Sequence, residues 1–189
     1  QYAALFLDGE ADMLEDDDFE KSRELKKRAA RLYYRGCLYS LRGLELDHHD
    51  FRKRLREDPE KMLSRMGKKD VPLLFWAGAG WIGTISIDSS NMARLAELSL
   101  AEAVMRRVLA LEEDFGDGVV HEFFISFEGG RSEMMGGSAE RAREHYRRAV
   151  VLWDGGKASP HVALAATVAV REQNLEEFKD LLEKALAVD

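Results

Sequence analysis

The stretch GGSAERAREHYRRAVVLWDGG, residues 136–156, decides the fold class of this chain. Glycine pairs bound it at both ends, as is common where a helix stops and the chain turns. Between them, Ala142, Tyr146 and Ala149 recur at helical spacing, while arginine and glutamate residues occupy the opposite face. Ser138 stands where a helix-capping residue is expected. The stretch therefore predicts one amphipathic helix.

The order small–aromatic–small in this helix is typical of the second helix of a tetratricopeptide repeat. In such repeats a small residue lets the paired helix approach, and the aromatic ring fills the gap between neighbours. Residues 162–185 repeat the pattern without insertion, and residues 76–108 repeat it around an inserted segment. We therefore expect an all-α fold, a tetratricopeptide-like helical repeat (α-solenoid) with cryptic, inserted repeats. The residues expected to pack between helices are Gly80, Ala142, Tyr146, Ala149, Ala166, Phe178 and Ala185.

Length and composition are those of one helical domain with a substantial core. The chain has 189 residues, of which 46% are hydrophobic, and only 3 prolines. We expect a single helical-repeat domain over residues 1–189. Its net charge of -7 argues against a nucleic-acid-binding face, which needs clustered Lys and Arg. Its repeat-like units are expected roughly at residues 28–66, 70–113, 117–154 and 159–187.

The run VPLLFWAGAGWIGTISI, residues 71–87, carries no charged side chain. A membrane-spanning helix needs about 20 apolar residues, and this run is shorter and contains Pro72. A helix buried on all sides explains the composition more simply. A third interpretation is a helix that lines an apolar ligand cavity, with Trp76 and Trp81 as its walls.

A second strongly apolar segment, residues 119–127, carries three phenylalanines. Our hypothesis is that the two aromatic-rich helices line a shared apolar cavity or bore. The alternative is a generic tetratricopeptide-like scaffold that binds a peptide or a partner helix in a groove. The candidate cavity-lining residues are Phe75, Trp76, Trp81, Phe123, Phe124 and Phe127.

Two motifs resemble those of a nucleotide site and a metal site, but their context supports neither. The pattern Gly78-x-Gly80-x-x-Gly83 matches a dinucleotide-binding fingerprint, yet that fingerprint needs a preceding strand, and the context here is helical. The run Asp47-His48-His49-Asp50 is expected to be a polar surface turn, because adjacent helical residues point about 100° apart and cannot converge on one metal ion.

The isolated histidines His121 and His145 are expected to form hydrogen bonds at helix contacts. Cys37 lies on a predicted buried stripe and is expected to be a small core residue. No nucleophile, base and acid set stands out. The sequence therefore predicts a protein that is not an enzyme and has no catalytic residues, metal site or cofactor.

Four segments together resemble one family. They are residues 71–87, LAEAVMRRVLALEEDFGDGVVHEFF (residues 100–124), residues 136–156 and FKDLLEKALAVD (residues 178–189). The chain resembles the T-component (TatT) proteins, accessory proteins of tripartite ATP-independent periplasmic (TRAP) transporters. The resemblance implies a periplasmic protein, with a lipid anchor in the full-length precursor, that docks a TRAP solute-binding protein. It also implies a homo-oligomer such as a trimer, and an apolar passage for a hydrophobic or organic-acid ligand.

Overall fold

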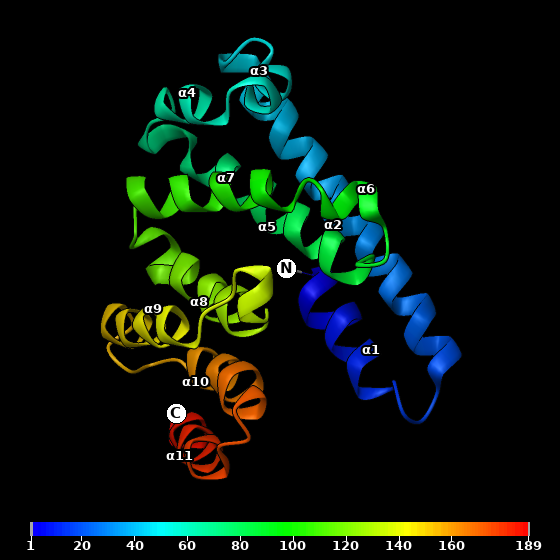
Figure 1. The fold of residues 1–189 in the computed structure, drawn as a ribbon, viewed down its shortest axis with the longest axis vertical. Coiled ribbons are helices and arrows are strands. Elements are labelled where there is room, and N and C mark those ends of the chain that lie inside the picture. The colour runs from blue at the N-terminus through cyan, green and yellow to red at the C-terminus, as the bar shows by residue number, and fades with distance from the viewer. Residues whose placement is uncertain (1, 189) are drawn as a thin grey trace. The chain divides into compact units, whose positions relative to one another are not determined.

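The computed structural model describes residues 2–188, and every regular element in that range is helical (Figure 1). The all-α prediction is therefore confirmed. The chain forms two compact units, Gln1–Leu111 and Glu112–Asp189. The solenoid arrangement, its four repeat-like units and the single-domain organisation stay predictions. The end residues of the predicted domain, 1 and 189, lie outside the described residues.

The longest helix of the first unit is α2. Asp18 caps this helix through a hydrogen bond from the Lys21 backbone N–H at 3.0 Å. The helical elements of the unit are η1 (Ala3–Asp8), α1 (Gly9–Met13), α2 (Phe19–Asp47), α3 (Phe51–Glu57), α4 (Pro59–Ser64), η2 (Lys68–Asp70), α5 (Val71–Ile87), α6 (Met92–Leu95) and α7 (Leu98–Leu111).

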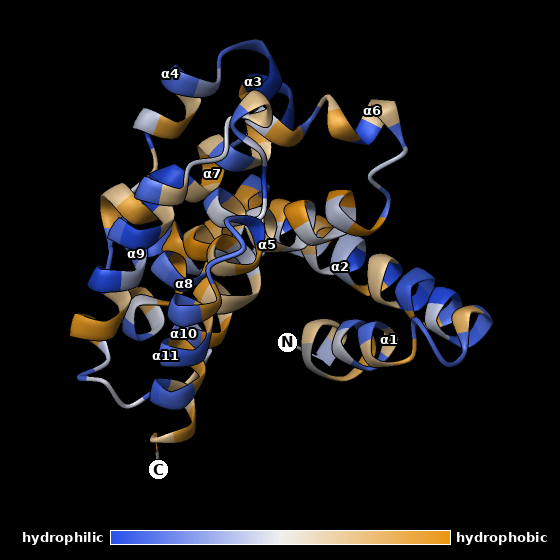
Figure 2. Cartoon of the chain, turned by 60° about the horizontal axis from the view of Figure 1, so that its bottom comes forward, coloured by the Kyte–Doolittle hydropathy of each residue, from blue (hydrophilic) through white to orange (hydrophobic). Residues whose placement is uncertain are grey.

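The uncharged helix α5 is the centre of the first unit and contacts both α2 and α7. Figure 2 shows the hydrophobic residues that α5 contributes to this layer. A Cβ atom at Gly80 would lie 2.8 Å from the Tyr33 carbonyl oxygen, and one at Gly78 would lie 2.6 Å from the Met105 sulfur. The glycines of the dinucleotide-like motif therefore serve close helix packing, most strictly at Gly80, where the obstacle is a backbone atom that cannot rotate away.

The N-terminal elements η1 and α1 pack on α2. Ala3 and Leu7 are buried with Ala29 of α2, and the Ser22 hydroxyl donates a hydrogen bond to the Ala11 carbonyl at 2.7 Å. The apolar opening of the sequence thus covers one side of α2, and the acidic run that follows it forms the turn between α1 and α2.

The second unit packs its helices around small residues. Ala142 and Ala149 of the deciding stretch are fully buried there, and Tyr146 and Phe178 pack against the same cluster, which also contains Leu164. Ser138 caps α9 through the Arg141 backbone N–H at 3.2 Å, as the sequence predicted. The elements of the unit are α8 (Phe115–Gly129), η3 (Glu133–Met135), α9 (Ala139–Leu152), α10 (Ser159–Leu164), η4 (Ala165–Ala169) and α11 (Leu175–Leu186).

Gly116, Asp117 and Gly118 form a turn at the start of α8. All three residues have positive φ, of 57°, 59° and 84°. A Cβ atom at Gly118 would also lie 2.8 Å from Leu152 Cδ1 of α9. Glycine is therefore required at Gly118 both by its backbone conformation and by the close approach of α9.

One expectation for the segment after Gly156 differs from the structure. Ala166 is exposed, and Ala165 and Ala169 point into the core instead. Ala166 lies four residues after the exposed Val162 and four before the exposed Val170, so it falls on the outward-facing side of this helical segment. Ser159 does not cap α10; its hydroxyl donates to Glu122 Oε2 at 2.9 Å. Ala185, on α11, is half-buried.

Candidate functional site

Two of the three predicted aromatic residues on α5 belong to the core of the first unit. Phe75 and Trp81 are both buried. The Trp81 indole N–H donates a hydrogen bond to Glu97 Oε2 at 3.0 Å, and Glu97 also pairs with Arg56 at 2.8 Å. The indole N–H of a buried tryptophan needs such a partner. Glu97 therefore fixes the orientation of the Trp81 ring.

Trp76 differs from its neighbours because 41% of its surface is exposed. Trp76 stands three residues after Leu73 on α5. Leu73 contacts α2, because a Cβ atom at Gly43 would lie 3.0 Å from the Leu73 side chain. Tyr39 and Leu46 lie seven residues apart on one face of α2, and both are exposed, as Trp76 is on α5. We call Tyr39, Leu46 and Trp76 the apolar seam.

Sequence reasoning named Trp76 but placed Tyr39 on an apolar stripe of α2 and did not predict that Tyr39 and Leu46 are exposed. The signal was present: Gly36, Tyr39, Gly43 and Leu46 recur at intervals of three and four residues on α2. It was overlooked because an apolar helical stripe ordinarily predicts a buried face, whereas this one is solvent-exposed.

The three predicted phenylalanines lie on α8 in the second unit. Phe124 is fully buried and stacks on His145, with ring centroids 4.9 Å apart. Phe123 is half-buried and stacks on Phe127 at 5.4 Å. The Arg131 guanidinium lies 3.6 Å from the centroid of the Phe127 ring. The cation covers that ring, so Phe123 is the member of the trio with the most accessible surface.

Two histidines that sequence reasoning treated separately meet beside Phe124. The Nδ1 atoms of His121 and His145 lie 2.9 Å apart, so one ring donates a hydrogen bond and the other accepts it. The expectation of histidines hydrogen-bonded at a helix contact is confirmed. Burial lowers the pKa of His121, and the nearby Glu113 carboxylate opposes that shift only in part. Arg148 donates a hydrogen bond to Glu113 from Nε at 3.0 Å and holds the pKa of this carboxyl below its usual value.

The Asp47–Asp50 run is not wholly the surface turn that we expected. His48 turns inward, and its Nε2 atom lies 2.9 Å from Oδ1 of the buried Asp70. His49 remains exposed beside Asp50. Sequence reasoning missed the pairing because Asp70 lies 22 residues away. Among the described residues, no three His, Cys, Asp or Glu side chains gather as a group that could hold a metal ion.

Cys37 is a buried core residue, as predicted. Burial raises the pKa of its thiol to about 12, so the thiol stays protonated and unreactive near neutral pH.

One helical stretch, Lys68–Ile87, is long and apolar enough by composition to cross a membrane. However, 61% of its apolar window is buried within the protein. Helices at the core of soluble proteins pass the same test, so the stretch is weak evidence for membrane insertion.

The fold and the apolar seam define a class: an all-α protein whose aromatic surface is suited to contact with a partner or an apolar ligand. The chain matches the family described as TRAP transporter T-component over residues 1–189, and it belongs to that family. It is also 27% identical, over 192 residues, to an uncharacterised protein of Treponema pallidum (strain Nichols). The match covers 100% of this chain and 59% of that relative.

Proposed function

We propose that this chain is a periplasmic accessory protein of a TRAP transporter that docks the solute-binding protein through the apolar seam. Membership of the T-component family supports the transporter role. The observation that carries the docking surface is Trp76, an exposed tryptophan on a helix that is otherwise mainly buried. Tryptophan and tyrosine are enriched among the residues that dominate protein–protein binding energy, and exposed apolar patches mark interaction sites.

Self-association and a lipid anchor in the full-length precursor are parts of the same proposal. Both rest on the family resemblance. A homo-oligomer such as a trimer would hold several seams in one assembly, so each oligomer would take up several copies of the partner.

The proposal extends to an apolar or organic-acid ligand that contacts Trp76. Trp76 is the most accessible of the three predicted cavity-lining aromatic residues on α5, as Phe123 is of the three on α8. Phe75, Trp81 and Phe124 are buried core residues whose substitution would disturb folding. A charged residue in place of Trp76 would repel an apolar ligand and leave the core intact.

The test is native mass spectrometry of the protein alone and mixed with the TRAP solute-binding protein of the same organism. We expect a defined homo-oligomer that takes up this partner stoichiometrically. Trp76→Ser should weaken that uptake at least about tenfold, as is typical when a central aromatic residue is truncated. Met134→Ser is the matched control, because Met134 is also exposed but lies on η3 in the second unit.

A monomer that ignores the solute-binding protein would refute the docking proposal and favour the generic scaffold. Equal loss of uptake in the Met134→Ser variant would move the docking surface away from the apolar seam. Circular dichroism of both variants checks that the helical fold is retained.

A further inference from the structure

The middle of α2 carries a run of basic residues that no acidic residue interrupts. Residues 25–44 hold six Lys or Arg and no Asp or Glu. Lys27, Arg28 and Arg35 each stand three or four residues from Arg31, so the four side chains share one side of the helix. All four are exposed. We call these four residues the cationic face.

The cationic face has no acidic partner in the described part of the chain. Within residues 2–188, its four side chains form no hydrogen bond or ion pair. Lys26, directly beside them, pairs with Asp12 at 3.2 Å and with Glu15 at 2.9 Å. Positive charges three or four residues apart on a helix repel one another, so the cationic face destabilises α2 on its own. A negatively charged partner from outside would remove this repulsion.

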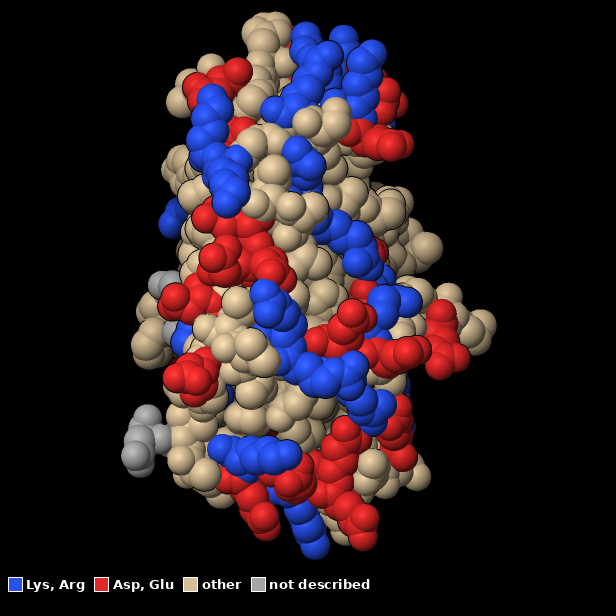
Figure 3. Space-filling model, turned by 90° about the vertical axis from the view of Figure 1, so that its left-hand side faces the viewer, with Lys and Arg blue, Asp and Glu red and all other residues tan. Residues whose placement is uncertain are grey.

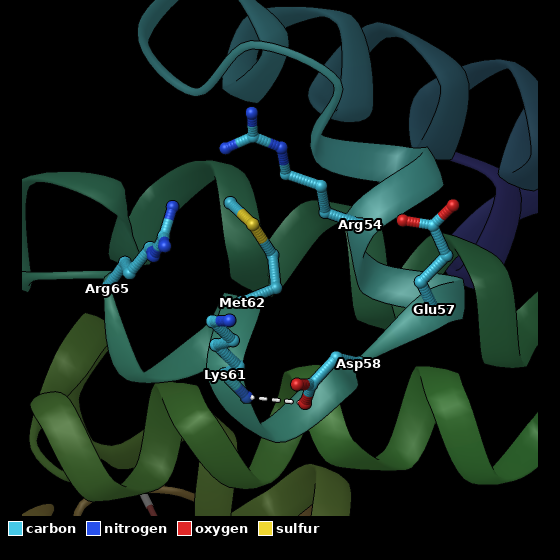
Figure 4. A pocket seen from close by; sticks show the side chains of 6 residues that line it. All are labelled: Arg54, Glu57, Asp58, Lys61, Met62 and Arg65. Atoms are coloured by element: carbon cyan, nitrogen blue, oxygen red, sulfur yellow. Dashed lines mark hydrogen bonds between the residues drawn. The ribbon is translucent and has the colours of Figure 1, made fainter.

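Other cations of the chain lie among carboxylates. Figure 3 shows Lys and Arg beside Asp and Glu over the face of the molecule that it draws. A surface hollow in the first unit has the same mixture, and Figure 4 shows the Glu57 and Asp58 carboxylates at this hollow together with cations. Because charges of both signs line it, the hollow does not select an anion as the cationic face does. Its lining residues are Arg54, Glu57, Asp58, Lys61, Met62 and Arg65.

The limited length of the cationic face restricts what can cover it. Lys27 and Arg35 are eight residues apart in the sequence, which is about 12 Å along a helix. Glu20 and Glu24 occupy the same side of α2 just before the cationic face, and both are exposed. Glu24 stands four residues before Arg28, yet within the described residues the two form no ion pair. A flat anionic membrane would meet these carboxylates together with the cations, whereas a narrow partner covers the cations alone.

A second helix is a narrow partner with the matching spacing. Side chains three or four residues apart lie about 5–6 Å from one another on any α-helix. Glutamates at every fourth position of a partner helix would therefore meet Lys27, Arg31 and Arg35 in succession. The planar guanidinium of arginine suits such a partner, because it binds a carboxylate through two parallel N–H···O bonds. Tyr39, four residues after Arg35 and exposed, adds an aromatic contact at the end of the row.

We propose that the cationic face of α2 binds an acidic helix of a partner protein, one whose carboxylates recur at intervals of four residues. Ion pairs between neighbouring helices set partner choice in the same way along coiled coils. The inference goes beyond the proposed function, because the cationic face shares no residue with the apolar seam. It also does not depend on the docking of a solute-binding protein.

The test is fluorescence anisotropy of a labelled synthetic peptide titrated with the full chain. The peptide has about 20 residues, long enough to form a helix, with glutamate at every fourth position and alanine elsewhere. Binding is expected at low ionic strength and should weaken in about 0.15 M NaCl, which screens exposed charges. Arg31→Gln combined with Arg35→Gln should weaken binding about tenfold, since each exposed ion pair contributes a factor of about three.

The matched control combines Arg54→Gln with Arg65→Gln. It removes the same charge from two exposed arginines, but these line the hollow and lie outside the cationic face. The control should leave peptide binding nearly unchanged. A second peptide, with the same glutamates gathered in one block, should bind more weakly because its charges cannot follow the row. Circular dichroism checks that both protein variants keep the helical fold.

Absence of peptide binding at low ionic strength would overturn the proposal, and so would equal weakening in the control variant. Equal binding of the block peptide would show attraction to negative charge in general and would also refute it. Binding to vesicles that contain phosphatidylglycerol, without binding to the peptide, would assign the cationic face to a membrane surface instead. The titration contains no solute-binding protein, so its failure and the failure of the docking proposal are distinguishable.

Discussion

Gly80 shows most directly how one residue determines the packing of the first unit. Any Cβ atom at this position would lie 2.8 Å from the Tyr33 carbonyl oxygen and 3.1 Å from the Cys37 backbone nitrogen. Both obstacles belong to the backbone of α2, so no side-chain rotation can relieve the overlap. The two helices would have to move apart along a contact that organises the unit.

We therefore expect Gly80→Ala to lower the free energy of unfolding by about 1–3 kcal/mol, the usual cost of overpacking a core. Urea denaturation followed by circular dichroism measures this change. Gly36→Ala is the matched control, because nothing lies within 4 Å of a Cβ atom there and Gly36 is inside α2. The control should gain roughly 0.5–1 kcal/mol from helix propensity. Equal effects in the two variants would contradict this account of the α2–α5 contact.

The His121–His145 pair predicts a loss of stability in mild acid. The folded-state pKa of His121 is lowered by burial from an unfolded value of 6.5, so the unfolded chain binds protons more readily. Stability is then fully present above the unfolded pKa and is lost as the pH falls toward the folded pKa. The charged groups near His121 are Glu113, Arg148 and Glu144, and only the two glutamates favour its protonation.

Urea midpoints measured at about pH 7.5 and about pH 5.5 test this prediction, since histidine titrates in that window. The midpoint should be lower at the acid pH for the wild-type protein, and this difference should shrink for His121→Asn. His49→Asn is the control, because His49 is exposed. An unchanged midpoint of the wild-type protein between the two pH values would disprove the prediction.

At the scale of elements, α9 and α11 are joined by one arginine. Arg143 of α9 binds Glu177 of α11, from Nε at 3.0 Å and from Nη2 at 2.7 Å, and it also binds Glu172 at 2.5 Å. The hydrogen bond from Arg143 holds the pKa of Glu172 below its usual value. Bidentate geometry makes this pairing stronger than an ordinary surface ion pair.

Replacement of Arg143 by Met should lower the free energy of unfolding by about 1 kcal/mol, a modest value because the cluster is partly exposed. Part of this loss should disappear in high salt, which screens the repulsion between the two glutamates that remain. Denaturation with and without added NaCl measures both effects. Arg147→Met, on the same helix, should have little effect, and a comparable loss in that variant would exclude a specific role for Arg143.

Most helices could be predicted from local sequence patterns, because caps and apolar periodicity are local signals. Ser138 caps α9 as predicted, and α5 spans the uncharged run of residues 71–87. Asp18 and Asp58 cap α2 and α4 in the same way. Features that depend on distant contacts were not predictable in this way. The His121–His145 contact depends on tertiary packing, and so does the choice of Ala165 over Ala166 as the residue that faces the core.

The candidate site was predictable only in part, for a related reason. Hydrophobicity selected α5 and α8, but it could not separate Trp76 from the buried Trp81 on the same helix. That distinction depends on where α2 crosses α5, which is set by Gly80 and Gly43 together with their partners. The surface hollow lined by Arg54, Lys61 and Arg65 could not be found by motif. These residues come from α3, from α4 and from the residue after α4, and their spacing matches no recognised pattern.

At the scale of the whole molecule, the second unit has a core of its own. Its buried cluster draws Ile125 from α8, Ala142 from α9, Leu164 from α10 and Leu181 from α11. We therefore expect residues 112–189 expressed alone to be helical and to unfold cooperatively, with the low stability that is usual for so short a chain. Circular dichroism during thermal unfolding tests this. A fragment without a cooperative transition would favour the single domain that the sequence predicted.

The positive charge of residues 51–69, eight Lys or Arg against three Asp or Glu, affects how the first unit approaches a charged surface. Residues 1–111 hold 19 basic and 19 acidic side chains, so the +5 of residues 51–69 is balanced by negative charge elsewhere in that unit. Such a separation gives the unit a permanent electric dipole. In the field of a charged surface the dipole of the first unit experiences a torque before any atoms touch, and this torque favours turning residues 51–69 toward negative charge. Its first encounters are therefore oriented, even though the unit is neutral overall.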